Sequence, residues 1–110
     1  MKIAVLVFGE FREFENAHKS WTFLNDIDYD IYLSTWNISH EINKEYLNID
    51  LYEEITEYKI LKYFPNAIVN IDDPIYSQYS TKIVYHWRKL FNMITISGKK
   101  YDNIIIIRTD

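Results

Sequence analysis

The apolar residues of this 110-residue chain gather into four short runs, and each run predicts a β-strand. The last run is the most distinctive, because four consecutive isoleucines precede Arg108, Thr109 and Asp110. An uninterrupted apolar run of this length is typical of a strand buried on both faces inside a parallel sheet. The four strands are expected at residues 3–8, 29–36, 67–71 and 104–107.

Apolar residues spaced three or four apart predict helices between these strands. The first is expected over residues 15–24, with Ala17, Trp21 and Leu24 on one face. The second is expected over residues 53–64 and ends before Pro65. The third is expected between Ser77 and Gly98, and its core stripe is Tyr79, Ile83, Trp87, Leu90 and Ile94. Residues 37–51 are polar and mixed, consistent with a loop containing a short helix.

Strands that alternate with helices predict one α/β domain over residues 1–110, with three layers (α/β/α) and a mostly parallel, Rossmann-like sheet. The commonest doubly wound arrangement gives the strand order 3-2-1-4. In that order the first and fourth strands are neighbours, although the chain reverses direction between them. Ligands of such sheets bind outside the carboxyl ends of the strands at this reversal. We therefore expect the site where strands 3–8 and 104–107 end.

Composition narrows the classes of function. The net charge of −4 argues against a nucleic-acid partner, which needs a basic surface. The absence of cysteine excludes disulfides and zinc–thiolate sites. No segment approaches the roughly 20 apolar residues that cross a bilayer, and the short apolar start leads into charged residues without a cleavage site. We expect a cytoplasmic protein with no transmembrane segment.

Two short segments lie at the expected site, one after the first strand and one after the fourth. Gly9 directly follows the first strand and allows a tight turn close to a ligand. Phe11 and Arg12 come next, and an arginine there suits bidentate contact with phosphate. At the end of the fourth strand, Arg108 can neutralise a leaving diphosphate. Asp110 can hold Mg²⁺ or Mn²⁺, which prefer oxygen ligands. Neither a G-x-G-x-x-G nor a Walker motif is present.

Three further features of this edge each have two interpretations. Trp36 is the last residue of the second strand, and the two interpretations are that it stacks on a nucleobase or that it packs beneath a loop. Asp72 and its neighbour Asp73 follow the third strand. They are interpreted either as contacts to a ribose or a base, or as a turn that leads into Pro74. The three histidines, which show no metal-ligand spacing and no evident Ser or Asp partner, are interpreted as structural or surface residues: His18, His40 and His86.

These motifs carry a family resemblance. The opening strand with Gly9 and Arg12, the second strand ending Thr35-Trp36, and the ending Ile107-Arg108-Thr109-Asp110 resemble the N-terminal half of GT-A-like glycosyltransferases. The nearest likeness is to bacterial and large-virus or phage enzymes of surface-polysaccharide synthesis. The resemblance covers nearly the whole chain through short motifs.

The resemblance implies transfer of a sugar from a nucleotide-sugar donor to a hydroxyl acceptor such as a glycan. Gly9 and Arg12 would line the diphosphate site, and Asp110 would bind the metal. Arg108 replaces the first acid of the usual Asp-x-Asp. The resemblance covers only the donor-binding half of such enzymes and not the half that binds the acceptor and supplies any catalytic base, so it implies a donor-binding half that is inactive alone. The alternatives are a non-catalytic α/β module and a receiver-like signalling domain with Asp72 as phosphate acceptor.

Overall fold

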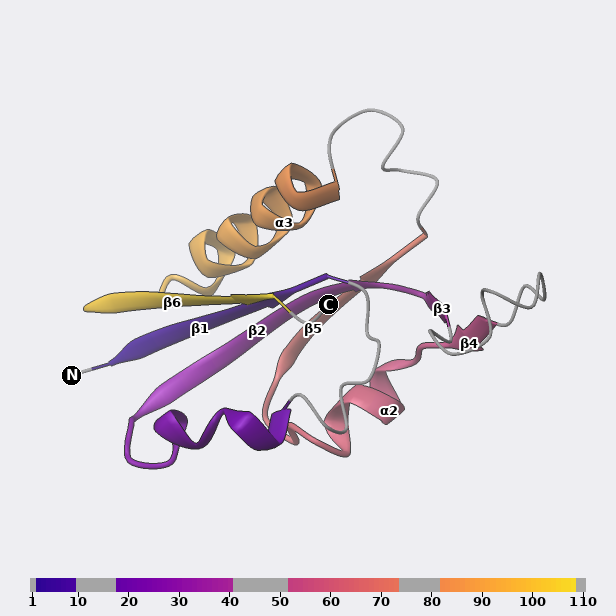
Figure 1. Cartoon of the computed structure of the whole chain (residues 1–110). Coiled ribbons are helices and arrows are strands. Elements are labelled where there is room, and N and C mark those ends of the chain that lie inside the picture. The colour runs from indigo at the N-terminus through magenta and orange to yellow at the C-terminus, as the bar shows by residue number, and fades with distance from the viewer. Residues whose placement is uncertain (1, 10–17, 41–51, 74–81, 109–110) are drawn as a thin grey trace.

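The computed structural model describes residues 2–9, 18–40, 52–73 and 82–108. Its centre is a four-stranded parallel sheet in the order β5-β2-β1-β6 (Figure 1). In chain order this is 3-2-1-4, so the predicted topology is confirmed. The predicted strands are confirmed with shifts of one residue at some ends. They are β1 (Ile3–Phe8), β2 (Tyr29–Trp36), β5 (Ile68–Asp72) and β6 (Asn103–Arg108).

The two central strands form the core. Every residue of β1 is buried, as are Ile31–Trp36 of β2, because helices or helical turns cover both faces of these strands. Successive side chains alternate between the faces and divide the core into two clusters. Val5, Val7 and Leu33 belong to one cluster, whereas Leu6 and Tyr32 belong to the other.

Helix α3 (Lys82–Ser97) covers the Leu6 face of the sheet (Figure 1). Leu90 faces the sheet and is fully buried, as its place in the predicted stripe requires. Trp87 was expected in the core, but 40% of it is exposed. It lies at the border of the covered area and meets the ring of Phe8 edge-on at 6.0 Å. The predicted start of this helix, together with the side chain of Ile83, lies outside what the structure describes.

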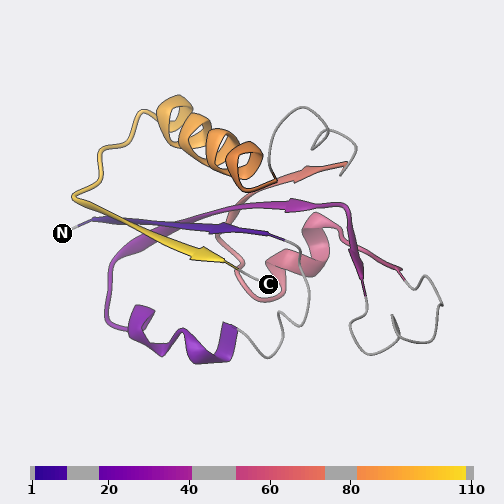
Figure 2. The same cartoon turned by 45° about the horizontal axis from the view of Figure 1, so that its top comes forward.

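The opposite face is covered by shorter elements. The predicted first helix is wrong over its described residues, because 18–24 form two 3₁₀ turns, η1 (His18–Ser20) and η2 (Thr22–Leu24). Ser20 and Thr22 compete for backbone hydrogen bonds and lower helix propensity. Trp21, between the turns, stacks on Phe64 at 5.8 Å. Figure 2 shows these turns and α2 on the side of the sheet opposite α3.

The predicted second helix is also shorter than expected. Helix α2 spans Glu57–Leu61, and Thr56 caps it by accepting a hydrogen bond from the Lys59 amide. The residues before it form β4 (Tyr52–Glu54), which pairs antiparallel with β3 (Ile38–His40). Acidic residues at 53 and 54 suggested a first helical turn, but they lie in this two-stranded sheet. The segment expected as a loop with a short helix therefore begins with a strand.

The isoleucine strand is not buried on both faces. β6 is the edge of the four-stranded sheet, and Ile104 and Ile106 are 46% and 45% exposed. Ile105 and Ile107 point to the other face and pack partly against its core cluster. The isoleucines predicted the strand correctly. Its burial depends on the elements that pack beside it, and the sequence of the strand does not specify those elements.

Candidate functional site

The carboxyl ends of β1 and β6 lie side by side, as the predicted topology requires. Phe8, the last residue of β1, pairs in register with Arg108, the last residue of β6. From β1 the chain moves toward β2 and β5, and it then returns past β1 to form β6. This reversal is the topological switch point at which open α/β sheets bind ligands. Arg108 is exposed there.

Gly9 forms the turn out of β1. Its φ of 118° lies in a region that side chains disfavour, so a glycine is required by the backbone. Its carbonyl oxygen accepts a 2.7 Å hydrogen bond from the buried Thr35 hydroxyl. The end of β2 therefore holds this turn in place, and β1 leaves the sheet in a defined direction at the switch point.

A row of side chains crosses this edge on the face covered by α3. Phe8 is paired with Arg108 on one side and with Ser34 on the other, and Ser34 is paired in turn with Asn70. Neighbouring strands lie about 4.8 Å apart, so the row extends roughly 14 Å from β6 to β5. The next row contains Trp36 beside Asp72.

A hydrogen-bond network joins α3 to the two strands at one end of this row. The Ser34 hydroxyl lies 2.7 Å from Nδ1 of His86, and both side chains are buried. Nδ2 of Asn70 donates to Oγ of Ser34 at 3.3 Å and to Oδ2 of Asp72 at 2.6 Å. The network thus runs from a helix residue in the core to a carboxylate at the end of β5.

Trp36 is enclosed by α3. The residue is 4% exposed, and its ring lies 4.3 Å from the His86 ring and 5.3 Å from the Tyr85 ring, centroid to centroid. This placement matches the packing interpretation of Trp36, because the helix occupies ring surface that a nucleobase would need. Trp36 therefore packs between the end of β2 and α3.

The predicted site residues fall into two pairs and an undescribed remainder. Gly9 and Arg108 come together at the ends of β1 and β6, and Trp36 and Asp72 come together at the ends of β2 and β5. The candidates outside the described residues are Phe11, Arg12 and Asp110. Pro74, where the proposed turn after Asp73 ends, also lies outside them.

A divalent ion at this edge stays a prediction. Within the described part of the chain, no group of three or more His, Cys, Asp or Glu side chains is arranged to hold a metal. Asp110, the predicted ligand, is not among those residues. The described residues by themselves therefore supply no set of ligands for a metal ion.

Sequence reasoning missed Ser34, Asn70 and His86 as a connected group. His86 was expected to have no Ser or Asp partner, and that expectation is wrong because Ser34 contacts it. One signal was present: Tyr32, Ser34 and Trp36 alternate on one face of a strand, and His86 precedes the core residue Leu90 by one helical turn. His18 and His40 have side chains that the structure does not describe.

Comparison with models of known protein families, with curated protein sequences and with solved structures found no match to this chain. None of the helices in the described ranges is long and apolar enough to cross a membrane.

Proposed function

We propose that this chain supplies the donor-binding half of a glycosyltransferase that moves a sugar from a nucleotide-sugar to a hydroxyl acceptor in glycan or polysaccharide synthesis. The observation that carries the proposal is the switch point itself, where Gly9 and the exposed Arg108 end adjacent parallel strands. The motif resemblance of these same strand ends to GT-A-like enzymes supports it.

The described residues suit the diphosphate better than the sugar. In glycosyl transfer the bond from the anomeric carbon to the diphosphate oxygen breaks, and the leaving diphosphate takes the electron pair. A new bond forms between that carbon and the acceptor oxygen, whose proton passes to a base. Arg108 would stabilise the charge on the departing diphosphate, and the Gly9 turn would let backbone approach it. Arg12 and Asp110 are proposed to complete the phosphate and metal contacts.

The nucleoside would extend from this diphosphate across the edge toward β5. Asp72 is the polar group in that direction, and its carboxylate is oriented by Asn70. A ribose hydroxyl or base amine donating to Asp72 fits the predicted role of that residue. The nucleobase would not stack on Trp36, because the His86 ring already packs against the Trp36 ring.

Calorimetric titration of the chain with UDP and GDP, with and without Mn²⁺, tests the proposal. Arg108→Ala is expected to weaken nucleotide binding at least tenfold, since it removes a charge-assisted contact. Lys100→Ala is the control, because Lys100 is also an exposed cation but precedes β6, at the end of that strand opposite Arg108. Equal weakening by both variants would show only a nonspecific charge effect and would contradict the site.

Asp110→Ala separates metal binding from phosphate binding. It is expected to abolish the effect of Mn²⁺ while leaving the metal-free affinity unchanged. A folded chain that binds neither nucleotide would favour the alternative of a non-catalytic α/β module. The receiver-like alternative is weaker, because the flavodoxin-like order 2-1-3-4-5 places the third strand beside the first, whereas β2 separates β5 from β1 here.

A further inference from the structure

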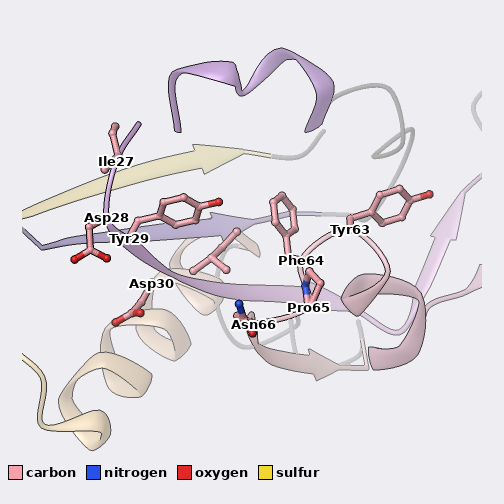
Figure 3. Close-up of a pocket in the computed structure, with 9 residues that line it drawn as sticks. Ile27, Asp28, Tyr29, Asp30, Tyr63, Phe64, Pro65 and Asn66 are labelled. Carbon is pink, nitrogen blue, oxygen red and sulfur yellow. The ribbon is translucent and has the colours of Figure 1, made fainter. Parts of the chain in front are cut away.

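A cavity of about 410 Å³ opens at the opposite, amino-terminal end of the sheet (Figure 3). It lies between the start of β2 and the loop that connects α2 to β5. Its lining includes Asp28, Tyr29, Asp30, Phe64, Pro65 and Asn66. The size is within the range of small-molecule sites. Tyr29, the first residue of β2 and part of this lining, is seven positions and about 23 Å from Trp36 at the other end of the strand.

The cavity exists because β5 is shorter than β2. Pairing between the two strands begins at Tyr32 with Ile68, so Tyr29–Ile31 have no strand beside them on that side within the described chain. This leaves a notch in the sheet bordered by strand backbone, which offers both amide donors and carbonyl acceptors. A ligand in the notch meets hydrogen-bonding groups at fixed positions.

The two walls of the notch differ in chemistry. Figure 3 shows the rings of Tyr29 and Phe64 on one side of β2 and the carboxylates of Asp28 and Asp30 on the other. Trp21 stacks on the Phe64 ring at 5.8 Å with nearly parallel planes, and Tyr29 and Phe64 both pack against the adjacent core cluster. Asn66, from the loop before β5, adds an amide that can donate and accept.

The carboxylates of this cavity are already neutralised. Nζ of Lys2 lies 3.2 Å from Asp28 and 3.5 Å from Asp30, and Nζ of Lys99 lies 3.4 Å from Asp30. A cationic ligand would have to displace these lysines and would gain little. Oxygen lone pairs of the carboxylates still accept hydrogen bonds from neutral hydroxyl groups.

We propose that this notch binds a neutral pyranose ring. A pyranose has an apolar face of C–H groups, which packs on the Tyr29 and Phe64 rings. Its hydroxyl groups donate to Asp28 and exchange hydrogen bonds with Asn66 and the open edge of Tyr29. A flexible peptide added beside β2 would reach only three unpaired residues and would lose more conformational freedom than a rigid ring.

Two-dimensional amide NMR of the ¹⁵N-labelled chain tests this, with methyl β-D-glucopyranoside and methyl β-D-galactopyranoside as probes. At least one probe is expected to shift the amide signals of residues 28–31 and 64–66 saturably in the millimolar range. Choline and a capped trialanine peptide test the other ligand classes. No saturable shift with either pyranoside, or saturable shifts produced by choline or the peptide instead, would overturn the proposal.

Variants at exposed positions keep the fold intact while changing the notch. Asn66→Ala and Asp28→Asn are each expected to weaken binding of the responsive pyranoside at least fivefold. The matched controls are Asn25→Ala and Asp26→Asn, which change the same residue types on the exposed surface outside the cavity. Unchanged affinity in both notch variants would also overturn the proposal. Nucleotide titration examines the other end of the sheet, so the two proposals fail independently.

Discussion

The Ser34 hydroxyl and Nδ1 of His86 lie 2.7 Å apart although 52 residues separate them in the chain. Both side chains are at most 1% exposed, so this hydrogen bond replaces water for two polar groups in the core. It joins α3 to β2 at a defined position along the strand. Apolar packing alone tolerates sliding of a helix over a sheet, whereas a buried polar pair specifies one placement.

Removing the hydroxyl of that pair is expected to destabilise the fold. Ser34→Ala should lower the free energy of unfolding by about 1–3 kcal/mol, the cost of leaving a buried polar atom without its partner. Thr95→Ala is the control, because the Thr95 hydroxyl bonds a helix carbonyl at the exposed surface and its loss should cost less than about 0.5 kcal/mol. Urea denaturation measures both. Equal losses would contradict the role of burial.

The two glycines of the chain are expected to respond differently to asparagine. Gly98, after α3, has φ of 68°, which asparagine tolerates, and no atom lies within 4 Å of an added Cβ. Gly98→Asn should therefore cost less stability than Gly98→Ala. Gly9 has φ of 118°, outside that region, so Gly9→Asn and Gly9→Ala should both cost about 1–3 kcal/mol. Thermal unfolding of the four variants checks this, and rescue of Gly9 by asparagine would contradict it.

Asp30 anchors a polar cluster at the amino-terminal end of the sheet. Its Oδ2 accepts a 2.8 Å hydrogen bond from the Tyr101 hydroxyl, which lies 2.6 Å from that of Tyr32. Burial alone would raise the pKa of Asp30, but hydrogen bonds from Tyr101 and Lys99 and the charges of Lys2 and Lys99 outweigh it and lower the pKa below its usual value. Burial and the hydrogen bonds to Tyr32 and Asp30 raise the pKa of Tyr101.

The lowered pKa of Asp30 predicts a loss of stability in acid. The ionised carboxylate contributes fully above the unfolded pKa of about 3.9, and this contribution disappears as the pH falls through the lower folded pKa. Asp30→Asn should cost about 1.5 kcal/mol between pH 5 and 7, and the difference from the wild type should shrink below about pH 4. Urea denaturation across this pH range measures the difference. Asp26→Asn, at an exposed position, controls for the change in net charge. A difference that grew in acid would contradict the assignment.

The strands and their order were predictable from sequence because they depend on short-range signals. A continuous apolar run such as Ile3–Phe8 has no helical period, and the β-α-β alternation leaves few permitted topologies. The position of Gly9 beside the end of the isoleucine strand followed from that topology. This part of the candidate site needed no knowledge of side-chain packing.

The errors concern features that depend on distant residues. The spacing of Trp21 predicted a helix, but its ring stacks on Phe64, which comes from a different part of the chain. Two 3₁₀ turns on either side of Trp21 place the ring there without a regular helix. His86 has a partner that only the placement of α3 on β2 provides. The spacing of apolar residues in the sequence predicts helices and strands, but it does not predict which other element packs against a given side chain.

The exposed half of the isoleucine strand provides a further prediction. Ile106 is paired with the fully buried Leu6, yet 45% of it is exposed because α3 lies over β1 and β2. Ile106→Thr keeps a β-branched side chain, so stability should change by less than about 0.5 kcal/mol. Ile105→Thr should cost about 1 kcal/mol or more, because Ile105 packs against the opposite core cluster. Thermal unfolding at low protein concentration measures both.

The same strand should also govern association of the chain at high concentration. Edge strands usually carry charges or prolines that prevent pairing with other molecules, but the four central residues of β6 are all isoleucine. The double variant Ile104→Thr with Ile106→Thr removes the exposed apolar surface and should reduce light scattering in concentrated solution. Ile68→Thr is the control on the other edge, where Ile68 is 42% exposed but Asn70 and Asp72 follow in the same strand. An equal reduction by Ile68→Thr would show that exposed isoleucines in general, and not those of β6 in particular, cause the association.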